Sequence, residues 1–300
     1  MGRTKKGDPV DGVMLLDKTL GMSSNGALQK VRRLLNAQKA GHTGTLDPMA
    51  TGLLPLCFGN ATKFSADLLD ADKGYTARVK LGVTTTTGDV EGEVLETRDL
   101  SGVTLEAIEA AARSWTGEIE QIPPMYSALK KDGRCLYELA RRGETVEREL
   151  RRVVIHELTV SDFDGESFTM ATLVSKGTYI RVLAEDIGRT LGTGAHLTAL
   201  RRTRVGHLTL DKAVTVETLE ALGTPEAVRV KLTPSDALLS TLEPVRLEAE
   251  AAKRFLFGQR LPLGLALRGR VRVYDNVGML LGTALVDERG VLAPERLIAH

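Results

Sequence analysis

The segment GHTGTLDPMATGLLPLCFG, which runs from Gly41 to Gly59, is the most unusual part of this 300-residue sequence. It holds four glycines and two prolines, a composition that favours a loop of specified conformation over a long regular element. Asp47 stands before Pro48 near its centre, and two interpretations of this pair are open. Asp-Pro suits a helix N-cap followed by proline at the first helical position. Alternatively, the glycines allow a ligand or another stretch of backbone to approach Asp47 closely.

Regular elements of both kinds are predicted around this segment. Apolar spacing predicts helices over residues 24–36, 61–70, 104–115 and 179–191, with Thr104 as the cap of the third. Apolar runs and alternation predict strands over residues 12–17, 75–81, 145–162 and 167–175. Helices and strands follow one another irregularly, and several strands are separated only by short turns. This order indicates a mixed, largely antiparallel α+β domain rather than a regular βαβ array.

A second, smaller domain is predicted at the carboxyl end of the chain. A chain of 300 residues corresponds to about two domains. The composition shifts to Thr, Ser and Pro over residues 233–244, and a compact unit follows, with a helix at 248–257 and strands at 271–274 and 279–286. We therefore predict a first domain over residues 1–240 and a small β-rich domain over residues 241–300.

The charge is balanced in total but uneven along the chain. Lys and Arg number 40 against 39 Asp and Glu, a net charge of +1, which excludes a protein that coats nucleic acid by overall charge alone. Residues 84–120 hold nine acidic and two basic side chains, whereas residues 251–272 hold six basic and no acidic ones. Residues 121–156 and 176–207 are also basic, by +3 and +4. Such local basic segments suit contacts with a phosphate backbone, although each alone could be an ordinary solvated face.

The sequence also excludes several cellular settings. Its longest apolar stretches, such as Leu261–Leu267, are far shorter than the roughly 20 residues that span a bilayer. Residues 1–8 are charged and have no apolar stretch behind them that would suit a signal peptide. Cys57 and Cys135 fit neither a disulfide framework nor a zinc site by their spacing. We expect a soluble, cytoplasmic protein with reduced cysteines, no membrane contact and no bound metal.

Three single residues have competing explanations. Arg181 falls in the first turn of a predicted helix, where the helix dipole disfavours a cation. A carboxylate paired with Arg181 would explain this placement, and exposure to solvent would explain it equally well. Tyr75 begins an apolar strand and would by default be a core residue, while His42 would by default be a loop histidine.

Six motifs of this sequence closely resemble those of TruB-type tRNA pseudouridine synthases. They are GHTGTLDPMATGLLPLCFGNATK (41–63), KGYTA (73–77), LGVTTTTGDVEGEV (81–94), QIPPMYSALKKDGRCLYELARRG (121–143), SKGTYIRVLAEDIG (175–188) and LGTGAHLTALRRTRVG (191–206). The motifs occur in the family's order and at its spacing. Thr19 and Thr86 depart from the pattern, at positions where the family usually has proline and commonly has aspartate.

The resemblance implies a catalytic group of three residues. It makes Asp47 the essential carboxylate, which either attacks the nucleoside covalently or abstracts a ribose proton. It makes Arg181 the partner that keeps this carboxylate charged in a site largely closed to water. It makes Tyr75 the residue that stacks on the target base, which suits a base taken out of its helix.

The resemblance also assigns residues that bind the RNA. His42 would occupy the space that the flipped base leaves, and Leu200 and Tyr179 would shape the uracil pocket. Residues 121–152 would form a mobile thumb that closes on the RNA. Four basic residues of this thumb would be available for phosphates: Lys130, Lys131, Arg141 and Arg142.

The activity implied by the resemblance is the isomerisation of uridine to pseudouridine at position 55, in the T-arm loop of tRNA. It needs no cofactor, and the sequence holds no nucleotide-binding fingerprint or metal-ligand cluster. We expect a pseudouridine-synthase fold with a central antiparallel sheet, a PUA-like RNA-binding module over residues 241–300, and a monomer that acts without a guide RNA. The alternative is a non-catalytic tRNA-binding or tRNA-folding chaperone of the same family, although the joint presence of Asp47, Tyr75 and Arg181 favours the enzyme.

Overall fold

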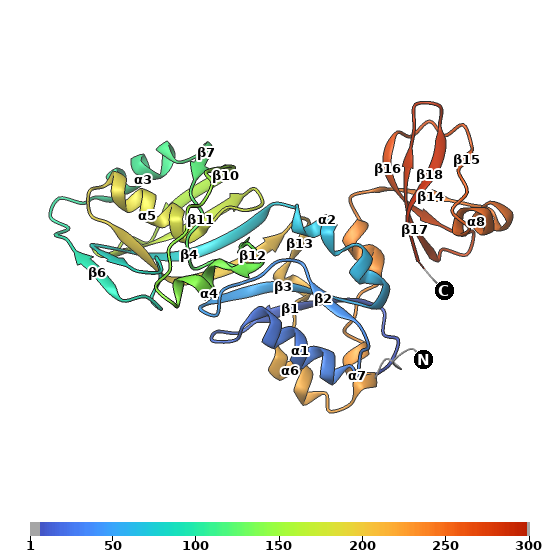
Figure 1. Ribbon diagram of the computed structural model, residues 1–300, viewed down its shortest axis with the longest axis horizontal. Helices are drawn as coiled ribbons and strands as arrows, with labels where there is room; N and C mark the ends of the chain where they lie inside the picture. The colour runs from blue at the N-terminus through green and yellow to red at the C-terminus, as the bar shows by residue number, and fades with distance from the viewer. Residues whose placement is uncertain (1–6, 299–300) are drawn as a thin grey trace.

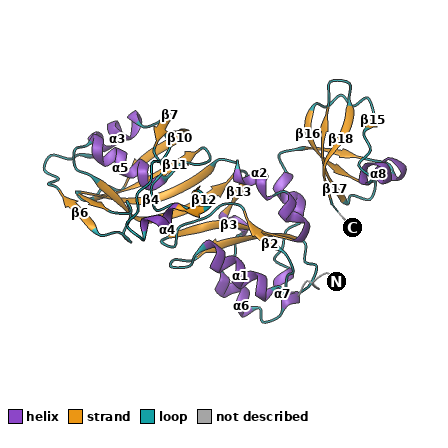
Figure 2. Ribbon diagram, viewed as in Figure 1, coloured by secondary structure: helices purple, strands orange, loops and turns teal. Residues whose placement is uncertain are grey.

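A large twisted sheet dominates the computed structural model, which describes residues 7–298 (Figures 1 and 2). The sheet has nine strands, and its main path runs β1–β3–β12–β4–β11–β10–β7. These strands are β1 (Gly12–Lys18), β3 (Ala50–Phe58), β12 (Ala195–Val205), β4 (Lys73–Leu81), β11 (Ser167–Val174), β10 (Arg151–Ser161) and β7 (Gly117–Gln121). Short strands β2 (Ala40–His42) and β13 (Leu208–Thr209) pair with β3 and β12. All neighbours are antiparallel except β3 and β12, which run parallel.

Helices cover the sheet in two groups. Helix α3 (Leu105–Ser114) packs on β10 and α5 (Ile180–Thr190) packs on β12, while α1 (Ser24–Leu34) and α6 (Val216–Ala221) contact each other near β1 and β2 (Figure 1). Thr104 caps α3 as predicted, because its side chain accepts a hydrogen bond from the Ala107 N–H. One buried apolar cluster joins residues of α1, the sheet, α3 and α5, and it forms the main core.

The remaining elements are short. They are η1 (Gly59–Lys63), α2 (Ser65–Leu69), β5 (Val83–Thr85), β6 (Val94–Thr97), β8 (Lys130–Lys131), β9 (Arg134–Cys135), α4 (Leu136–Ala140), η2 (Leu210–Lys212), α7 (Pro225–Arg229) and η3 (Ser235–Leu239). No helix among the described residues is long and apolar enough to cross a membrane.

The prediction of a loop throughout residues 41–59 is wrong for its second half. Strand β3 occupies Ala50–Phe58 and is buried along most of its length, because its two faces pack in two apolar clusters, with Leu54 and Leu56 in one and Leu53 and Cys57 in the other. Gly52 serves this strand and not a turn: a Cβ there would lie 2.2 Å from the Arg202 carbonyl oxygen, and its φ is +100°. A glycine in a strand interior commonly marks such a close approach of backbone.

The predicted strand over residues 145–162 begins later than expected. Strand β10 starts at Arg151, which is also where its pairing with β7 starts, opposite Gln121. Residues 145–150 therefore have no neighbouring strand, and most of their side chains are exposed. Charged and apolar residues alternate over 145–150, but this segment forms no strand because no neighbouring strand pairs with it.

The carboxyl-terminal part forms a separate five-stranded sheet of order β14–β16–β17–β18–β15. Its elements are β14 (Glu243–Arg246), α8 (Ala249–Leu256), β15 (Leu261–Pro262), β16 (Gly269–Tyr274), β17 (Leu280–Val286) and β18 (Val291–Leu297). It has a core of its own, but Ile298 and Leu280 join the apolar cluster formed by Val13, Leu53 and neighbouring residues of the large domain. The predicted fold class, a mixed α+β domain with a β-rich carboxyl-terminal unit, is confirmed.

Candidate active site

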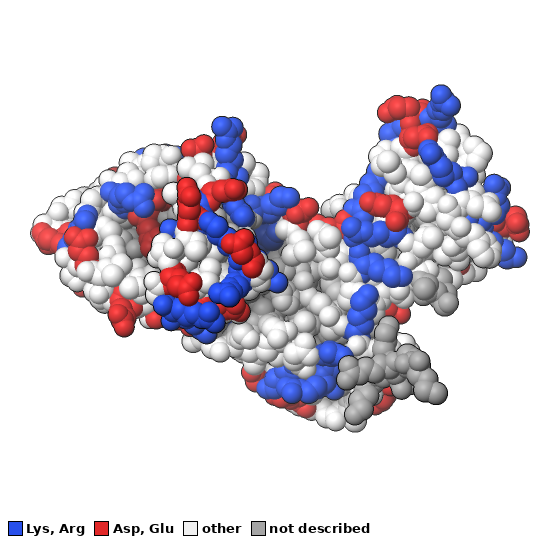
Figure 3. Space-filling model, viewed as in Figure 1, with Lys and Arg blue, Asp and Glu red and all other residues white. Residues whose placement is uncertain are grey.

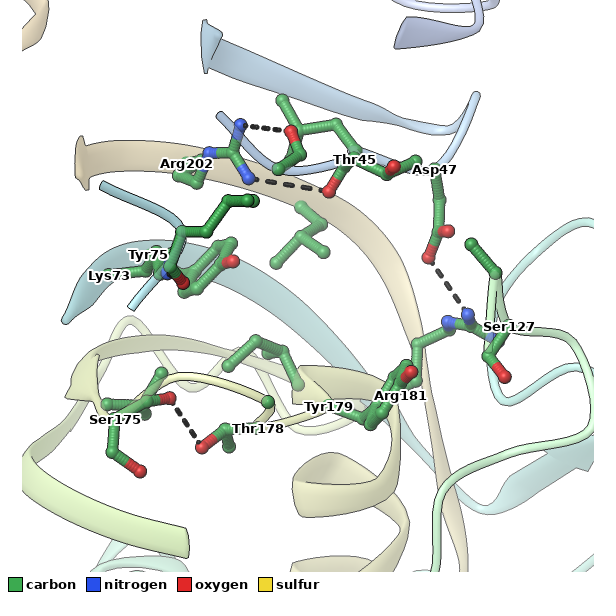
Figure 4. Close-up of a pocket in the computed structure, with 18 residues that line it drawn as sticks. Thr45, Asp47, Lys73, Tyr75, Ser127, Ser175, Thr178, Tyr179, Arg181 and Arg202 are labelled. Atoms are coloured by element: carbon green, nitrogen blue, oxygen red, sulfur yellow. Dashed lines mark hydrogen bonds and ion pairs between the residues drawn. The ribbon is translucent and has the colours of Figure 1, made fainter. Parts of the chain in front are cut away.

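A cavity of about 260 Å³ opens where the β2–β3 loop, β4, β12 and the start of α5 meet (Figure 4). Five of the predicted site residues line it: Asp47, Tyr75, Tyr179, Arg181 and Leu200. They come from four separate stretches of sequence, so the sheet must be complete before they meet. The remaining predicted residues lie outside this cavity.

Asp47 lies in the loop between β2 and β3, and its side chain is 37% exposed. The helix N-cap interpretation is wrong, because no helix follows Pro48 and β3 begins at Ala50. The Asp47 carbonyl instead accepts a hydrogen bond from the Ala50 N–H at 3.0 Å, which closes a tight turn. The carboxylate is thereby presented to the cavity rather than to a helix end.

Arg181 is the buried partner of Asp47. Its side chain is only 4% exposed, and its Nη2 lies 2.9 Å from Oδ2 of Asp47 (Figure 4). Its Nε lies 3.5 Å from Oδ2 of Asp89. Its Nη1 and Nη2 donate to the carbonyls of Thr87 and Tyr126, at 2.8 and 2.7 Å. Two carboxylates and two carbonyls therefore compensate a cation that the start of α5 would otherwise disfavour.

Asp89 is a site residue that reasoning from the sequence missed. Its side chain is 3% exposed, and its Oδ1 accepts hydrogen bonds from Thr87 Oγ1 at 2.5 Å and from the Glu91 N–H at 3.0 Å. These bonds fix the loop so that Oδ2 faces Arg181. The signal was present: an aspartate directly after Gly88, inside the motif at residues 81–94.

The aromatic and apolar walls of the cavity come from β4, β12 and the start of α5. Tyr75 is on β4, directly opposite Arg202 of β12, and Leu200 is opposite Ala77. Tyr179 precedes α5, and its backbone is held by Gln121, which accepts from the Tyr179 N–H at 3.0 Å and donates to its carbonyl at 3.4 Å. Burial raises the pKa of the Tyr179 hydroxyl, so it remains protonated at neutral pH.

Three cations are buried in this part of the protein, and two of them, Lys73 and Arg202, line the cavity. None of the three was predicted as a site residue. Lys18 Nζ donates to the carbonyls of Thr19 and Met22, and Lys73 Nζ donates to two carbonyls at the end of α2. Burial lowers the pKa of both lysines to about 8. Arg202 is the third cation, and its positive charge contributes to both shifts.

His42 and the four basic residues predicted to contact the RNA are not among the residues that line the cavity. His42 is a half-buried residue of β2, and burial together with the charge of Arg202 lowers its pKa, so that the ring is neutral at pH 7. Lys130, Lys131, Arg141 and Arg142 are exposed on the segment 121–152, around β8, β9 and α4. Figure 3 shows basic side chains interspersed with acidic ones over this part of the surface. The Lys131 ammonium donates to the Glu147 carbonyl at 2.9 Å.

The basic run at residues 251–272 is partly engaged within the protein. Arg270 forms ion pairs with Asp67 of α2 and with Glu295 of β18. Arg272 and Arg246 both lie over the ring of Tyr274, at 5.8 and 5.7 Å. Arg268 donates to the carbonyls of Leu265 and Leu267. Much of this charge therefore serves internal contacts.

Within residues 7–298 there is no group of three or more His, Cys, Asp or Glu side chains placed to hold a metal ion.

Three family models match successive parts of the chain. Residues 32–180 match the amino-terminal domain of the TruB family of pseudouridylate synthases. Residues 181–243 match the tRNA pseudouridylate synthase B C-terminal domain, and residues 244–298 match the model described as pseudouridine synthase II TruB, C-terminal.

Similar proteins and structures agree with these models. The chain is 59% identical over 296 residues to the tRNA pseudouridine synthase B of Burkholderia mallei, covering 96% of this chain and 97% of that protein. It is 58% identical over 299 residues to the protein of the same name from Cupriavidus metallidurans, covering 96% of this chain and 94% of that protein. A chain in the crystal structure of a Cbf5–Nop10–Gar1 complex superposes with a TM-score of 0.72 at 26% identity, covering 99% of this chain and 91% of that one. This protein belongs to the TruB family of pseudouridylate synthases.

Proposed function

We propose that this protein isomerises uridine to pseudouridine at position 55, in the T-arm loop of tRNA. The observation that carries the proposal is the ion pair between Asp47 and the buried Arg181, at the edge of a cavity that Tyr75 also lines. Membership of the family supports the reaction, and the name of its 57–59% identical relatives supports tRNA as the substrate.

The reaction rearranges one nucleotide without gain or loss of atoms. The bond between N1 of uracil and C1′ of ribose breaks, the uracil turns, and a bond forms between its C5 and C1′. The proton on C5 is then lost, and N1 gains one. Asp47 acts at the ribose, and both of its possible roles, attack on C1′ and removal of a ribose proton, need an ionised carboxylate. The guanidinium of Arg181 stabilises that charged form.

The other residues of the cavity hold the uracil. Tyr75 provides a flat ring for stacking on the flipped base, in keeping with how enzymes read extruded bases. Leu200 is 7% exposed and closes the apolar side of the cavity, which keeps water from the broken glycosidic bond. Outside the cavity, His42 takes the place of the base in the RNA stack, as a neutral ring. The exposed Lys130, Lys131, Arg141 and Arg142 contact phosphates.

The proposal is tested with a T-arm stem-loop that carries tritium on C5 of the target uracil. Asp47→Asn is expected to fold and to bind this RNA as the wild type does, but to release no tritium. Asp162→Asn is the matched control, because Asp162 is an exposed residue beyond β10 and its backbone φ of +53° suits asparagine. Release by Asp47→Asn near the wild-type rate would overturn the assignment.

The same experiment tests whether the enzyme acts alone. The solved structures of H/ACA complexes that superpose on this chain share only 23–24% identity with it. We propose that the purified 32.4 kDa protein acts as a monomer, without a guide RNA. Wild-type release from a mixture of protein and stem-loop alone supports action without a guide RNA, and a requirement for a second RNA would contradict it. The mass of the purified protein in solution tests the monomer.

A further inference from the structure

Arg202 is a fully buried arginine that has no carboxylate partner among residues 7–298. Its side chain is 1% exposed. Its guanidinium instead donates to three backbone carbonyls: Nε to Leu53 at 2.8 Å, Nη1 to Thr45 at 3.4 Å and Nη2 to Gly44 at 3.2 Å. Figure 4 shows the guanidinium of Arg202 directed at the loop that carries Asp47. A buried charge is costly, so an arrangement that leaves it unpaired calls for an explanation.

The three carbonyls bracket Asp47 in the sequence. Gly44 and Thr45 precede it, and Leu53 follows it in β3. The loop that presents the carboxylate and the strand that follows it are thus tied to one side chain. Glycine is required at two places near this contact: Gly44 has a φ of +119°, which L side chains rarely adopt, and a Cβ at Gly52 would lie 2.2 Å from the Arg202 carbonyl oxygen.

The backbone of Arg202 also fixes the other side of the cavity. It pairs in parallel with Gly52 of β3 and antiparallel with Tyr75 of β4. Residues directly opposite each other in an antiparallel pair lie about 4.5–5.5 Å apart at Cβ. Arg202 therefore stands between the strand that bears Tyr75 and the loop that bears Asp47, and it contacts both.

Arginine has the right shape for this task. Its planar fork directs several N–H groups at fixed angles, so one side chain can satisfy carbonyls on two sides of a loop. Lysine would keep the charge, but its single ammonium cannot reproduce the fork. Removing the side chain would leave three carbonyls, of which that of Leu53 is buried, without their donor.

We propose that Arg202 is a positioning residue that sets the location of Asp47 relative to Tyr75. The inference rests on the proposed function, which assigns those two residues to the reaction. Arg181 keeps the Asp47 carboxylate charged, whereas Arg202 holds the backbone on which that carboxylate stands. A displacement of about 1 Å in a reacting group costs on the order of 100-fold in rate. Loss of the fork should therefore slow the chemical step without weakening RNA binding.

The test compares Arg202→Lys and Arg202→Met with wild type in single-turnover tritium release at saturating enzyme. Both variants should lose about 10- to 100-fold in rate, while the dissociation constant for the stem-loop changes less than about 3-fold. Because lysine retains the charge, a slow Arg202→Lys separates geometry from electrostatics. Hydrogen exchange of residues 43–53 should become faster in Arg202→Lys, with residues 75–81 unchanged. This second readout stands if Arg202→Met does not fold.

Arg78→Met is the matched control. Arg78 is on β4 like Tyr75 but on the opposite face, and its guanidinium donates to the Asp162 carbonyl and to Thr169. It should lower the melting temperature while the release rate stays within about 2-fold of wild type. A near-wild-type rate for Arg202→Lys would overturn the proposal, as would equal losses in rate and RNA affinity. If Asp47→Asn releases tritium in the same assay, the proposed function fails, whatever Arg202 does.

Discussion

Nη2 of Arg181 lies 2.9 Å from Oδ2 of Asp47, and the same nitrogen donates to the Tyr126 carbonyl at 2.7 Å. One guanidinium nitrogen thus joins the loop of the carboxylate to the segment 121–152, which carries the exposed basic residues. The geometry makes Arg181 a member of the site rather than a surface cation, and its near-complete burial means that its loss leaves Asp47 and Asp89 uncompensated.

Arg181→Met should therefore reduce turnover far more than RNA affinity. We expect a fall of at least about 100-fold in the tritium-release rate, with the stem-loop dissociation constant changed by less than about 3-fold. Arg189→Met provides the control, since Arg189 is on the same helix but exposed and paired with Asp186. Equal losses in rate and affinity for Arg181→Met would make Arg181 a phosphate contact instead.

The stability of the protein should depend on pH through Glu185, which lies one turn after Arg181 on α5. Burial and the nearby Asp186 raise the pKa of Glu185 to about 7, from an ordinary value of 4.5. The folded state therefore holds a proton that the unfolded chain loses between pH 4.5 and 7. Stability falls as the pH rises through that range, and the cost is complete above pH 7.

Glu185→Gln should remove this cost. Relative to wild type, we expect Glu185→Gln to have a free energy of unfolding that is larger by about 2 kcal/mol at pH 8 than at pH 4.5, after allowance for partial solvent exposure. Urea unfolding at the two pH values measures the difference, with Glu157→Gln of the exposed face of β10 as control. A pH dependence that is the same in wild type and Glu185→Gln would show that Glu185 does not retain the proton.

Arg270 should couple the two sheets of the protein. Arg270 of β16 is paired with Asp67 of α2, whose side chain is 17% exposed. Nearby, Arg296 of β18 donates to the Lys63 carbonyl of η1, so two arginines of the carboxyl-terminal sheet contact the large domain. A double-mutant cycle with Asp67→Asn, Arg270→Met and the pair together should give a coupling energy of about 1 kcal/mol in thermal or chemical unfolding. Strict additivity of the two substitutions would mean that the ion pair does not hold the domains together.

The sequence predicted those features that depend on local pattern. The helix at 104–115 with its Thr104 cap, the alternation of β4 and the position of Arg181 at the start of α5 all follow from residues close together in the chain. The family motifs singled out Asp47, although its Asp-Pro pair alone also fitted a helix cap that the structure does not contain.

Features that depend on long-range register were missed. Gly52 seemed to be a loop glycine because the parallel pairing of β3 with β12 joins residues 150 positions apart. Arg202 seemed to be part of a basic run, since nothing near it in the sequence shows that three carbonyls from residues 44–53 surround it. The pairing of Asp89 with Arg181 also joins residues far apart in the chain, although Asp89 itself lies in one of the family motifs.

The placement of Ile298 has a consequence for the making of this protein. It packs in the same apolar cluster as Val13 and Leu53, so the last described residue of the chain covers strands that are among the first to be synthesised. Until residue 298 has left the ribosome, that side of β1 and β3 lacks part of its apolar cover. A chain truncated before β18 would expose part of this apolar cluster, and chaperones and proteases act on proteins with such exposed apolar surface. The last contacts of this cluster therefore form only after the carboxyl-terminal sheet has been synthesised.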